Sequence, residues 1–388
     1  MGCPQIVFHE ENFKLKSIAF NEGIGIDDAE DAISILSGSP DSLALVVLDL
    51  TATRSIEIGA GPRLGNLLRR FSGEKLKVRL PSMAQQSPKD YVSEHWKLLV
   101  RSGLGMGIAT HAGTIMFGDL PEREGFRELF LEEQDRRMQN ILLIPNIHST
   151  SRFDFEDRTT FSNILRSYLP TLNATERHFN SDGLAALVEF CRESILNVRD
   201  HSYKRPWGEG QRSVSYFSIR YHKRIPFVKT ELWALKQYFK RVNDSYPGAS
   251  STSYLEIVIN DDGNGIAARQ GLDSEIYWHY GNREEEFFAK ALSPGGSVKP
   301  LARDSLVRGH PGYGFSAMAS SLRALKGIGL VRSGKLLAVY DGTCGNPQST
   351  IFGLAPSNYR THLRYMPGTF IQTIIPIGFG TSQVMVSP

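Results

Sequence analysis

The sequence predicts an α/β fold with two domains, a smaller one followed by a larger one. The chain has 388 residues, more than the roughly 100 to 200 that one domain usually contains. Strand patterns alternate with helical spacing in the first part of the chain. A long amphipathic stretch and two glycine-rich turns follow in the second part, so we expect both halves to combine helices with a sheet.

The first elements form a βαβ unit. Residues 42–50 have the apolar run of a buried strand, and residues 62–71 have apolar side chains at helical intervals. Residues 75–81 alternate between polar and apolar side chains as a strand does. A helix between two such strands predicts that the strands run parallel.

A helix over residues 89–103 and an extended segment over 107–118 complete a domain predicted to span residues 1–118. Asp49 ends the first strand of the βαβ unit, before a loop and a helix. In this pattern the segment resembles a STAS-like regulatory module. The resemblance implies a role as regulator or adaptor.

Residues 119–154 are expected to connect the two domains. Apolar side chains at helical intervals predict a charged helix over residues 120–140, and residues 141–147 read as a short strand. We place the domain boundary within 145–158 and the second domain over 155–388.

The composition excludes several classes of protein. Hydrophobic residues make up 41% of the chain and charged residues 22%, as in ordinary globular proteins. A formal net charge of +3 favours no particular partner. Three cysteines without a CxxC spacing predict neither a disulfide framework nor a zinc site. We therefore expect a cytoplasmic protein without membrane contact, since no apolar run approaches the roughly 20 residues of a membrane span.

Residues 184–201 predict an amphipathic helix. At about 100° per residue its apolar side chains share one face. The opposite face carries Glu189, Glu193, Asn197, Asp200 and His201. A polar face of this kind is typical of a solvated helix surface, and it also fits a site that holds a ligand.

A strand over residues 253–261 runs directly into the sequence DDGNG. Asp261 thus stands at the end of the strand, and Gly263 and Gly265 allow backbone angles and close approaches that other residues do not. A calcium-binding loop is the alternative. Such a loop requires a glutamate at its twelfth position, where this chain has Leu272.

A second glycine cluster lies at Gly309, Gly312 and Gly314, immediately before a segment with helical spacing. Backbone N–H groups at a helix N-terminus favour an anion, and phosphate is the expected ligand. The alternative is a glycine-rich turn without a ligand. A last strand over residues 366–377 begins with Gly368 and Thr369.

The order of these four motifs, ExxxNxxDH, DxGxG, GxxGxG and a late GT, resembles the GHKL superfamily of ATP-binding domains. The name stands for gyrase, the heat-shock chaperone, the histidine kinases and MutL. The resemblance covers about 155–380 and implies a Bergerat fold, an α+β sandwich with a mixed sheet under helices. ATP and Mg²⁺ are the cofactors that it implies.

The resemblance assigns roles to individual residues. Asn197 would give an oxygen to Mg²⁺, which prefers oxygen ligands and bridges phosphates. Glu193, one turn earlier on the same face, would orient or deprotonate the attacking water. Asp261 would accept a hydrogen bond from the adenine amino group.

The remaining roles concern the base and the phosphates. Gly263 and Gly265 would close over the base, and Thr369 would support the adenine side. The phosphates would be cradled by Gly309, Gly312 and Gly314. Asp200 and His201 end the first motif, and no role is assigned to them.

Two further segments belong to this reading. Residues 266–308 correspond to the ATP lid of the family, for which a loop without function is the alternative. Residues 220–250 look like a basic insertion. Its interleaved aromatic residues are Tyr221, Phe227, Trp233, Tyr238 and Phe239. Such a composition can contact nucleic acid, and it is also typical of a surface helix whose aromatic residues pack inward.

The leading hypothesis is an ATP hydrolase whose nucleotide state controls the lid and the contact with a protein partner. A sensor histidine kinase needs a phosphoacceptor histidine, and no histidine of this chain stands in such a setting. Within the superfamily, the motifs most resemble those of soluble anti-sigma-like or histidine-kinase-like ATPases. A Ser/Thr protein kinase of the anti-sigma type is the second hypothesis. The third is a non-enzymatic, ATP-gated binding module, for which nucleic acid is one candidate partner. Dimers are frequent among members of the superfamily, so a homodimer is among the expectations.

Overall fold

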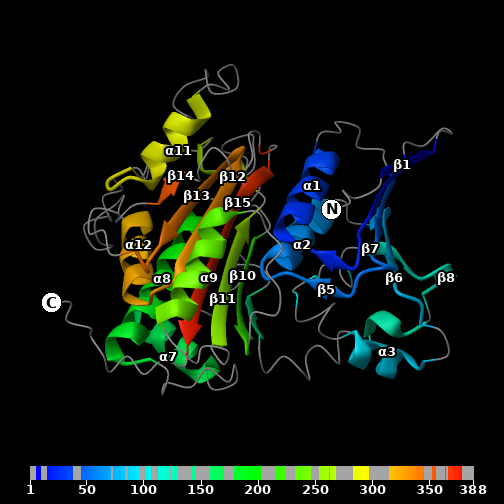
Figure 1. The fold of residues 1–388 in the computed structure, drawn as a ribbon, viewed down its shortest axis with the longest axis horizontal. Coiled ribbons are helices and arrows are strands. Elements are labelled where there is room, and N and C mark those ends of the chain that lie inside the picture. Colours follow the sequence, from blue (N-terminus) through cyan, green and yellow to red (C-terminus); the bar gives the residue numbers. More distant parts are fainter. Residues whose placement is uncertain are drawn as a thin grey trace. The chain divides into compact units, whose positions relative to one another are not determined.

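The computed structural model describes a large part of the chain in two compact units (Figure 1). The described residues are 6–9, 15–37, 45–70, 73–83, 86–95, 102, 104–105, 108, 112–122, 124–128, 141–144, 158–169, 179–201, 215–223, 232–245, 253–261, 263–267, 283–296, 314–344, 352–354, 363 and 366–377. The first unit ends at Met138, and the second comprises the rest of the chain except residues 226–231, which are assigned to the first. No described helix is long and apolar enough to cross a membrane.

The first unit is built on a mixed sheet with the strand order β1-β2-β4-β6-β7-β8. Its strands are β1 (Ile6–His9), β2 (Leu15–Ala19), β4 (Leu45–Asp49), β6 (Gly73–Leu80), β7 (Ala112–Phe117) and β8 (Leu120–Pro121). A separate parallel pair is formed by β3 (Gly23–Ile24) and β5 (Ser55–Ile56). The described helices are α1 (Ile26–Ser37), α2 (Ala60–Arg70) and α3 (Pro88–Glu94).

The predicted βαβ unit is confirmed. Strand β4 and strand β6 pair in parallel, and α2 lies between them in the chain. Helix α2 packs on α1, where Arg63 forms a buried ion pair with Glu30 at 3.3 Å. The N-terminus of α1 is held by Glu57, which accepts a hydrogen bond from the Ile26 amide at 2.8 Å.

The segment predicted to begin the connecting helix belongs to the first sheet instead. Gly118, at a φ of 62°, allows a tight turn after β7, and β8 pairs back on β7. The helical residues that are described start only at Phe126, and the predicted helix beyond Glu128 lies outside the described residues. The turn explains the difference, because a helix cannot start while the chain reverses to pair with its neighbour.

The second unit contains a sheet with the strand order β14-β13-β12-β15-β11-β10-β9. Its strands are β9 (Ile141–Ile144), β10 (Ser215–His222), β11 (Ser253–Asp261), β12 (Ile328–Gly334), β13 (Leu336–Asp341), β14 (Gly353–Leu354) and β15 (Met366–Ile377). The described helices are α7 (Arg158–Tyr168), α8 (Ser181–His201), α9 (Trp233–Ser245), α11 (Glu284–Leu292) and α12 (Gly314–Ala324).

Every pairing described in this second sheet is antiparallel. We expected a mixed sheet in this unit, but the described part of its sheet is purely antiparallel. The first unit has the mixed sheet. Strand β9, expected to be part of a connector, is an edge strand of the second sheet and pairs with β10. Its apolar sequence ILLI suits a strand that completes a buried sheet.

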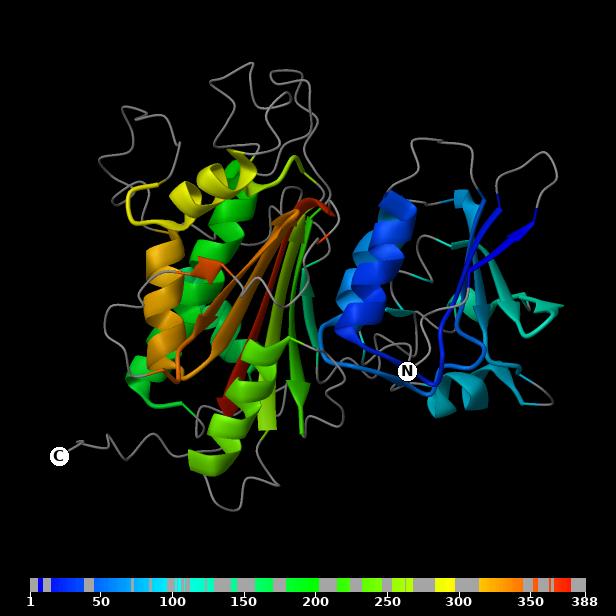
Figure 2. The ribbon, with the colours of Figure 1, turned by 45° about the horizontal axis from the view of Figure 1, so that its top comes forward.

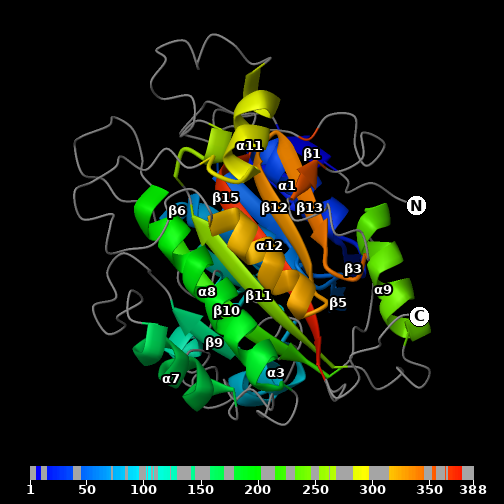
Figure 3. The same cartoon turned by 90° about the vertical axis from the view of Figure 1, so that its left-hand side faces the viewer.

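Helices α8 and α12 cover one face of the second sheet (Figure 3). Alternate residues of the strands point to this face, and they include Phe217, Leu255, Ile257 and Ile371. These side chains form one buried cluster with the apolar face of α8, including Leu187, as its helical spacing predicts. The sheet and the two helices thus enclose a single core.

The expected basic insertion at 220–250 consists, where it is described, of the end of β10 and of helix α9. Tyr238 is buried, and its hydroxyl donates to the carbonyl oxygens of Lys326 and Ile374, both at 3.1 Å. Phe239 packs edge-on against Tyr254. Inward packing of the aromatic residues is thereby confirmed for these two, whereas Trp233 at the start of α9 is 57% exposed. Phe227 lies outside the described residues.

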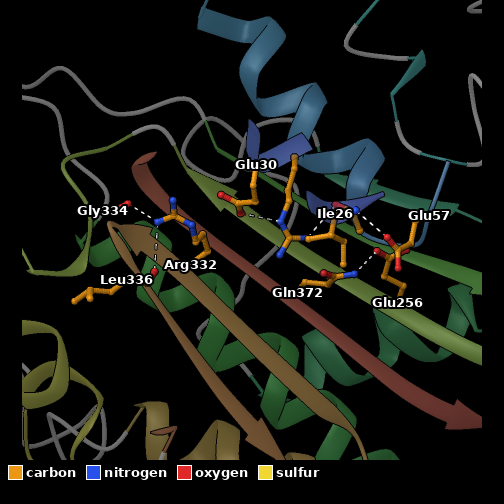
Figure 4. A network of polar contacts seen from close by, with 10 residues as sticks. Ile26, Glu30, Glu57, Glu256, Arg332, Gly334, Leu336 and Gln372 are labelled. Atoms are coloured by element: carbon orange, nitrogen blue, oxygen red, sulfur yellow. Dashed lines mark hydrogen bonds and ion pairs between the residues drawn. The ribbon is translucent and has the colours of Figure 1, made fainter. Parts of the chain in front are cut away.

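A buried cluster of polar residues lies on the sheet face opposite α8. Glu256 of β11 contacts Arg220 at 2.9 Å and His222 at 2.8 Å, both on β10. It also accepts a hydrogen bond at 3.0 Å from Gln372 of β15, as Figure 4 shows. Arg332 on β12 donates to the carbonyl oxygens of Gly334 and Leu336. The Glu256 carboxylate on β11 therefore connects this strand to both of its neighbours, β10 and β15.

The state of Glu256 follows from its partners. Burial alone would raise its pKa, but the charge of Arg220 and the hydrogen bonds from His222 and Gln372 outweigh burial and lower the pKa. A carboxyl group with a lowered folded-state pKa stabilises the fold above its ordinary pKa of about 4.3. That stabilisation is lost as the pH falls through the lowered value.

We predict that Arg220→Met costs about 3–5 kcal/mol of unfolding free energy, because it leaves Glu256 buried without its cationic partner. Arg241→Met is the matched control. Arg241 pairs with Asp341 but is 35% exposed, so its loss should cost less than about 1 kcal/mol. Urea unfolding at pH 7 measures both, and equal losses would contradict the role of the buried cluster.

Candidate functional site

Helix α8 carries the first pair of predicted site residues. Asn180 caps the helix, because its side-chain oxygen accepts from the Gly183 amide at 2.7 Å. From there the helix continues to His201, so Glu193 and Asn197 lie one turn apart on the same face. Asp200 and His201 belong to the last turn, and their side chains lie outside what the structure describes.

Glu193 is half-buried and forms an ion pair with Arg192 at 2.8 Å. The guanidinium contacts Oε1 of the carboxylate. Arg192 and Glu193 are neighbours in the sequence, and both belong to α8. The position of Glu193 therefore follows from the position of this helix. The carboxylate is therefore placed on the same helical face as Asn197.

Asn197 lies directly against the start of α12. Its Nδ2 is 3.6 Å from the Met318 sulfur, within reach of a weak hydrogen bond. A Cβ atom at Gly314 would stand 3.0 Å from both Oδ1 and Nδ2 of Asn197. A larger residue at position 314 would press against the Asn197 amide. The first and third sequence motifs meet at this contact.

Gly314 is the first residue of α12, and Gly309 and Gly312 lie outside the described residues. The helix predicted after these glycines is confirmed, with Met318 and Leu322 buried. The described part of the motif therefore places a helix N-terminus next to Asn197. Backbone N–H groups of such a first turn have no partner within the helix itself.

The second and fourth motifs meet on the sheet. Asp261, the last residue of β11, lies opposite Thr369 of β15 in the antiparallel register. Side chains alternate between the two faces of a sheet along each strand. Asp261 therefore points to the same face as Ile259, and Thr369 to the same face as Ile371, which is the face that α8 covers. Asp261 also accepts a hydrogen bond at 2.9 Å from the amide of Gly263. This bond turns the chain sharply after the strand.

The register extends this polar pair into a row. Ser215, at the start of β10, lies opposite Asp261, and Ser333 of β12 lies opposite Thr369. Both serines have the parity of residues in the helix-covered core, so the four polar side chains form a row across four adjacent strands on one face. Neither serine was among the residues predicted from the sequence. Their only signal is a serine within an apolar strand pattern, which gives no information about the opposing residues.

Ser333 connects the DxGxG loop to the last strand. Its hydroxyl accepts from the Ile266 amide at 2.9 Å and donates to the Gly368 carbonyl oxygen at 2.9 Å. Gly265 has a φ of 86°, and a Cβ atom there would be 2.7 Å from the Ser333 oxygen. Gly265, one of the two glycines predicted to close over a base, is therefore favoured by its backbone conformation and by the nearby Ser333 hydroxyl.

The predicted lid contains an anchored helix. Within residues 266–308, helix α11 buries Phe288 and Leu292 in the core of the second unit. Glu284 at its start accepts a hydrogen bond at 2.8 Å from the Lys335 amide, in the turn between β12 and β13. The rest of the predicted lid is described only at 266–267, 283 and 293–296. Helix α11 is part of the folded core in this structure.

All of these residues gather at one end of the second unit. Figure 2 shows the C-terminal ends of α8 and β11 together with the N-terminal ends of α12 and β15 at this end. The described residues contain no group of three or more His, Cys, Asp or Glu that could hold a metal ion. A metal bound here would have Asn197 as its protein ligand, and phosphate and water would complete its shell, as is common for Mg²⁺.

Comparisons with protein-family models, with curated proteins and with solved structures found no match for this chain. The function is therefore inferred from the positions and the chemistry of these residues.

We predict that Gly265→Ala destabilises the protein by about 3 kcal/mol or more, because it adds a clash with Ser333 to the strain of a positive φ. Gly295→Ala is the matched control. Gly295 has a φ of 77° and no atom within 4 Å of the added Cβ, so only the strain of about 1–2 kcal/mol applies. Urea unfolding compares the two, and equal losses would show that the contact with Ser333 is unimportant.

Proposed function

We propose that the second unit binds ATP with Mg²⁺ and hydrolyses it, as an ATPase of the GHKL type with a Bergerat-like arrangement. The observation that carries the proposal is the convergence of four separate motifs at one end of the unit. Asp261 faces Thr369 across two strands, and Asn197 touches Gly314 between two helices. Chance occurrence of the sequence motifs would not require them to meet in space.

The proposed base site is the row of polar side chains on the sheet. Asp261 is 4% exposed and stands at the lip of β11, where a carboxylate can accept from the amino group of adenine. Thr369 is its direct neighbour across the strands. Apolar residues of the same face, such as Ile259 and Ile371, provide the surroundings in which the base can be buried.

The proposed phosphate site is the contact between α8 and α12. Asn197 would hold Mg²⁺ through its side-chain oxygen, and the amides of the first turn of α12 would face the phosphates. Bound Mg²⁺ would neutralise charge on the phosphate oxygens. Only Gly314 of the three predicted phosphate-binding glycines is described, so Gly309 and Gly312 enter the proposal through the motif alone.

Glu193 is the proposed catalytic residue. It lies one turn before Asn197 on the same helical face. A water molecule beside the terminal phosphate would therefore lie on the side of the helix that carries the Glu193 carboxylate. Its carboxylate would orient this water and accept its proton. Its carboxylate is also paired with the Arg192 guanidinium at 2.8 Å.

We predict that Asp261→Asn weakens ATP binding by tenfold or more, since it replaces one carboxylate oxygen with an NH2 donor and removes the charge that strengthens the hydrogen bond. Asp341→Asn is the matched control. Asp341 also ends a strand and accepts from an amide two residues later, that of Thr343, at 2.9 Å. Titration calorimetry with ATP and Mg²⁺ measures the affinity of both variants. An unchanged affinity of the Asp261 variant would contradict the assignment of Asp261 to the adenine site.

The reaction is tested with a second pair of variants. Glu193→Ala should bind ATP with an affinity within a few-fold of the wild type and lose at least 100-fold in turnover, as expected when a general base is removed. Glu189→Ala, one turn earlier on α8 and paired with Arg158 at 3.6 Å, should keep turnover. With γ-labelled ATP, free phosphate supports hydrolysis. Label on a protein would favour the kinase instead, and binding without turnover in the wild type would favour a binding module.

A further inference from the structure

Ser215 is the first residue of β10 and lies directly opposite Asp261. It shares its parity with Phe217 and Ile219, which belong to the core beneath α8. Its side chain therefore points to the same face of the sheet as the Asp261 carboxylate. Directly opposed residues on one face of an antiparallel pair have Cβ atoms about 4.5–5.5 Å apart.

The hydroxyl of Ser215 is buried and unpaired. The residue has no exposed surface, and its Oγ has no hydrogen-bond partner among the described residues. Buried hydroxyl groups in folded proteins nearly always have a partner, so one without a partner requires an explanation. Alanine would fill almost the same space in the strand without this cost.

The other serine of the row shows the contrast. The Ser333 hydroxyl has two partners, because it accepts from the Ile266 amide and donates to the Gly368 carbonyl oxygen. Ser333 is thereby explained as a structural connection between two segments. Ser215 lies on the same sheet face, on a strand separated from β12 by β15 and β11, and its hydroxyl has no such partner among the described residues.

We propose that Ser215 is a base-specificity residue, and this inference rests on the proposed ATP site. Its hydroxyl donates a hydrogen bond to the ring nitrogen beside the amino group that Asp261 recognises. A donor next to an acceptor matches the edge of adenine, which presents an amino group beside an unprotonated ring nitrogen. Guanine presents a carbonyl oxygen and an N–H at these positions, so the carboxylate of Asp261 would face an oxygen.

The proposal explains why a buried hydroxyl is kept. A hydroxyl that forms its hydrogen bond only with the ligand is unsatisfied in the free protein. A nucleotide that supplies the missing acceptor therefore binds more tightly. A site built to pair with a polar group discriminates strongly against analogues that lack it. Ser215 and Asp261 would thus read two adjacent atoms of the base from two adjacent strands.

The test compares Ser215→Ala with Ser218→Ala. Ser218 is also buried on β10, at 4% exposed, but its parity directs it to the opposite face of the sheet. We expect Ser215→Ala to weaken ATP binding about tenfold, the effect of losing one hydrogen bond in a buried site, and Ser218→Ala to leave it unchanged. Titration calorimetry with ATP, GTP and Mg²⁺ gives the affinities, and the preference for ATP over GTP should fall in Ser215→Ala.

Thermal unfolding without nucleotide separates recognition from a structural role. Ser215→Ala should melt at the wild-type temperature or above it, because an unpaired hydroxyl has been removed. A melting temperature several degrees lower, or failure to fold, would show that the hydroxyl supports the fold and would overturn the inference. Wild-type affinity for ATP in this variant would overturn it too, while leaving the ATP site in place. If the wild type itself binds no ATP, the proposed function fails and this inference fails with it.

Discussion

The antiparallel register between β11 and β15 determines where the polar residues of the second unit lie. It sets Asp261 opposite Thr369, and the neighbouring ladders add Ser215 and Ser333 to the same row. A slip of one residue would turn the whole row to the other face, because side chains alternate along a strand. The long apolar strands resist such a slip, since Leu255 and its alternate neighbours would leave the core at the same time.

The helices add the second constraint. Close packing of α8 on α12 favours a glycine at the start of α12, because a Cβ there would stand only 3.0 Å from the Asn197 amide. Strand pairing thus positions the residues of the proposed base site, and helix packing positions those of the proposed phosphate site. One end of the unit can then combine an apolar surrounding, a buried carboxylate and a helix N-terminus, which together suit a nucleotide. Helix α11, within the segment predicted to be the lid, is held to the same core through Phe288 and to the turn between β12 and β13 through Glu284.

Part of this structure could be predicted because its signals are local. The periodicity of α8, the apolar run of β11 and the βαβ unit around α2 all depend on near neighbours in the sequence, and the structure confirms them. The position of β9 and β8 depends on pairing with distant strands, which a four-residue or two-residue segment does not reveal. Ser215 and Ser333 were missed for the same reason, because their importance comes from the residues opposite them. The roles of Glu193, Asn197 and Asp261 remain predictions that the geometry supports.

Hydrogen–deuterium exchange with and without ATP and Mg²⁺ tests the central claim most directly, because it reports on all four motifs in one measurement. We expect nucleotide to slow exchange together in residues 193–201 of α8, 263–267 after β11, 314–318 of α12 and 366–370 of β15. Strand β4 of the first unit, Leu45–Asp49, serves as the internal reference and should not change. Binding of ATP with unchanged exchange in these four segments, or with protection confined to the first unit, would contradict the account.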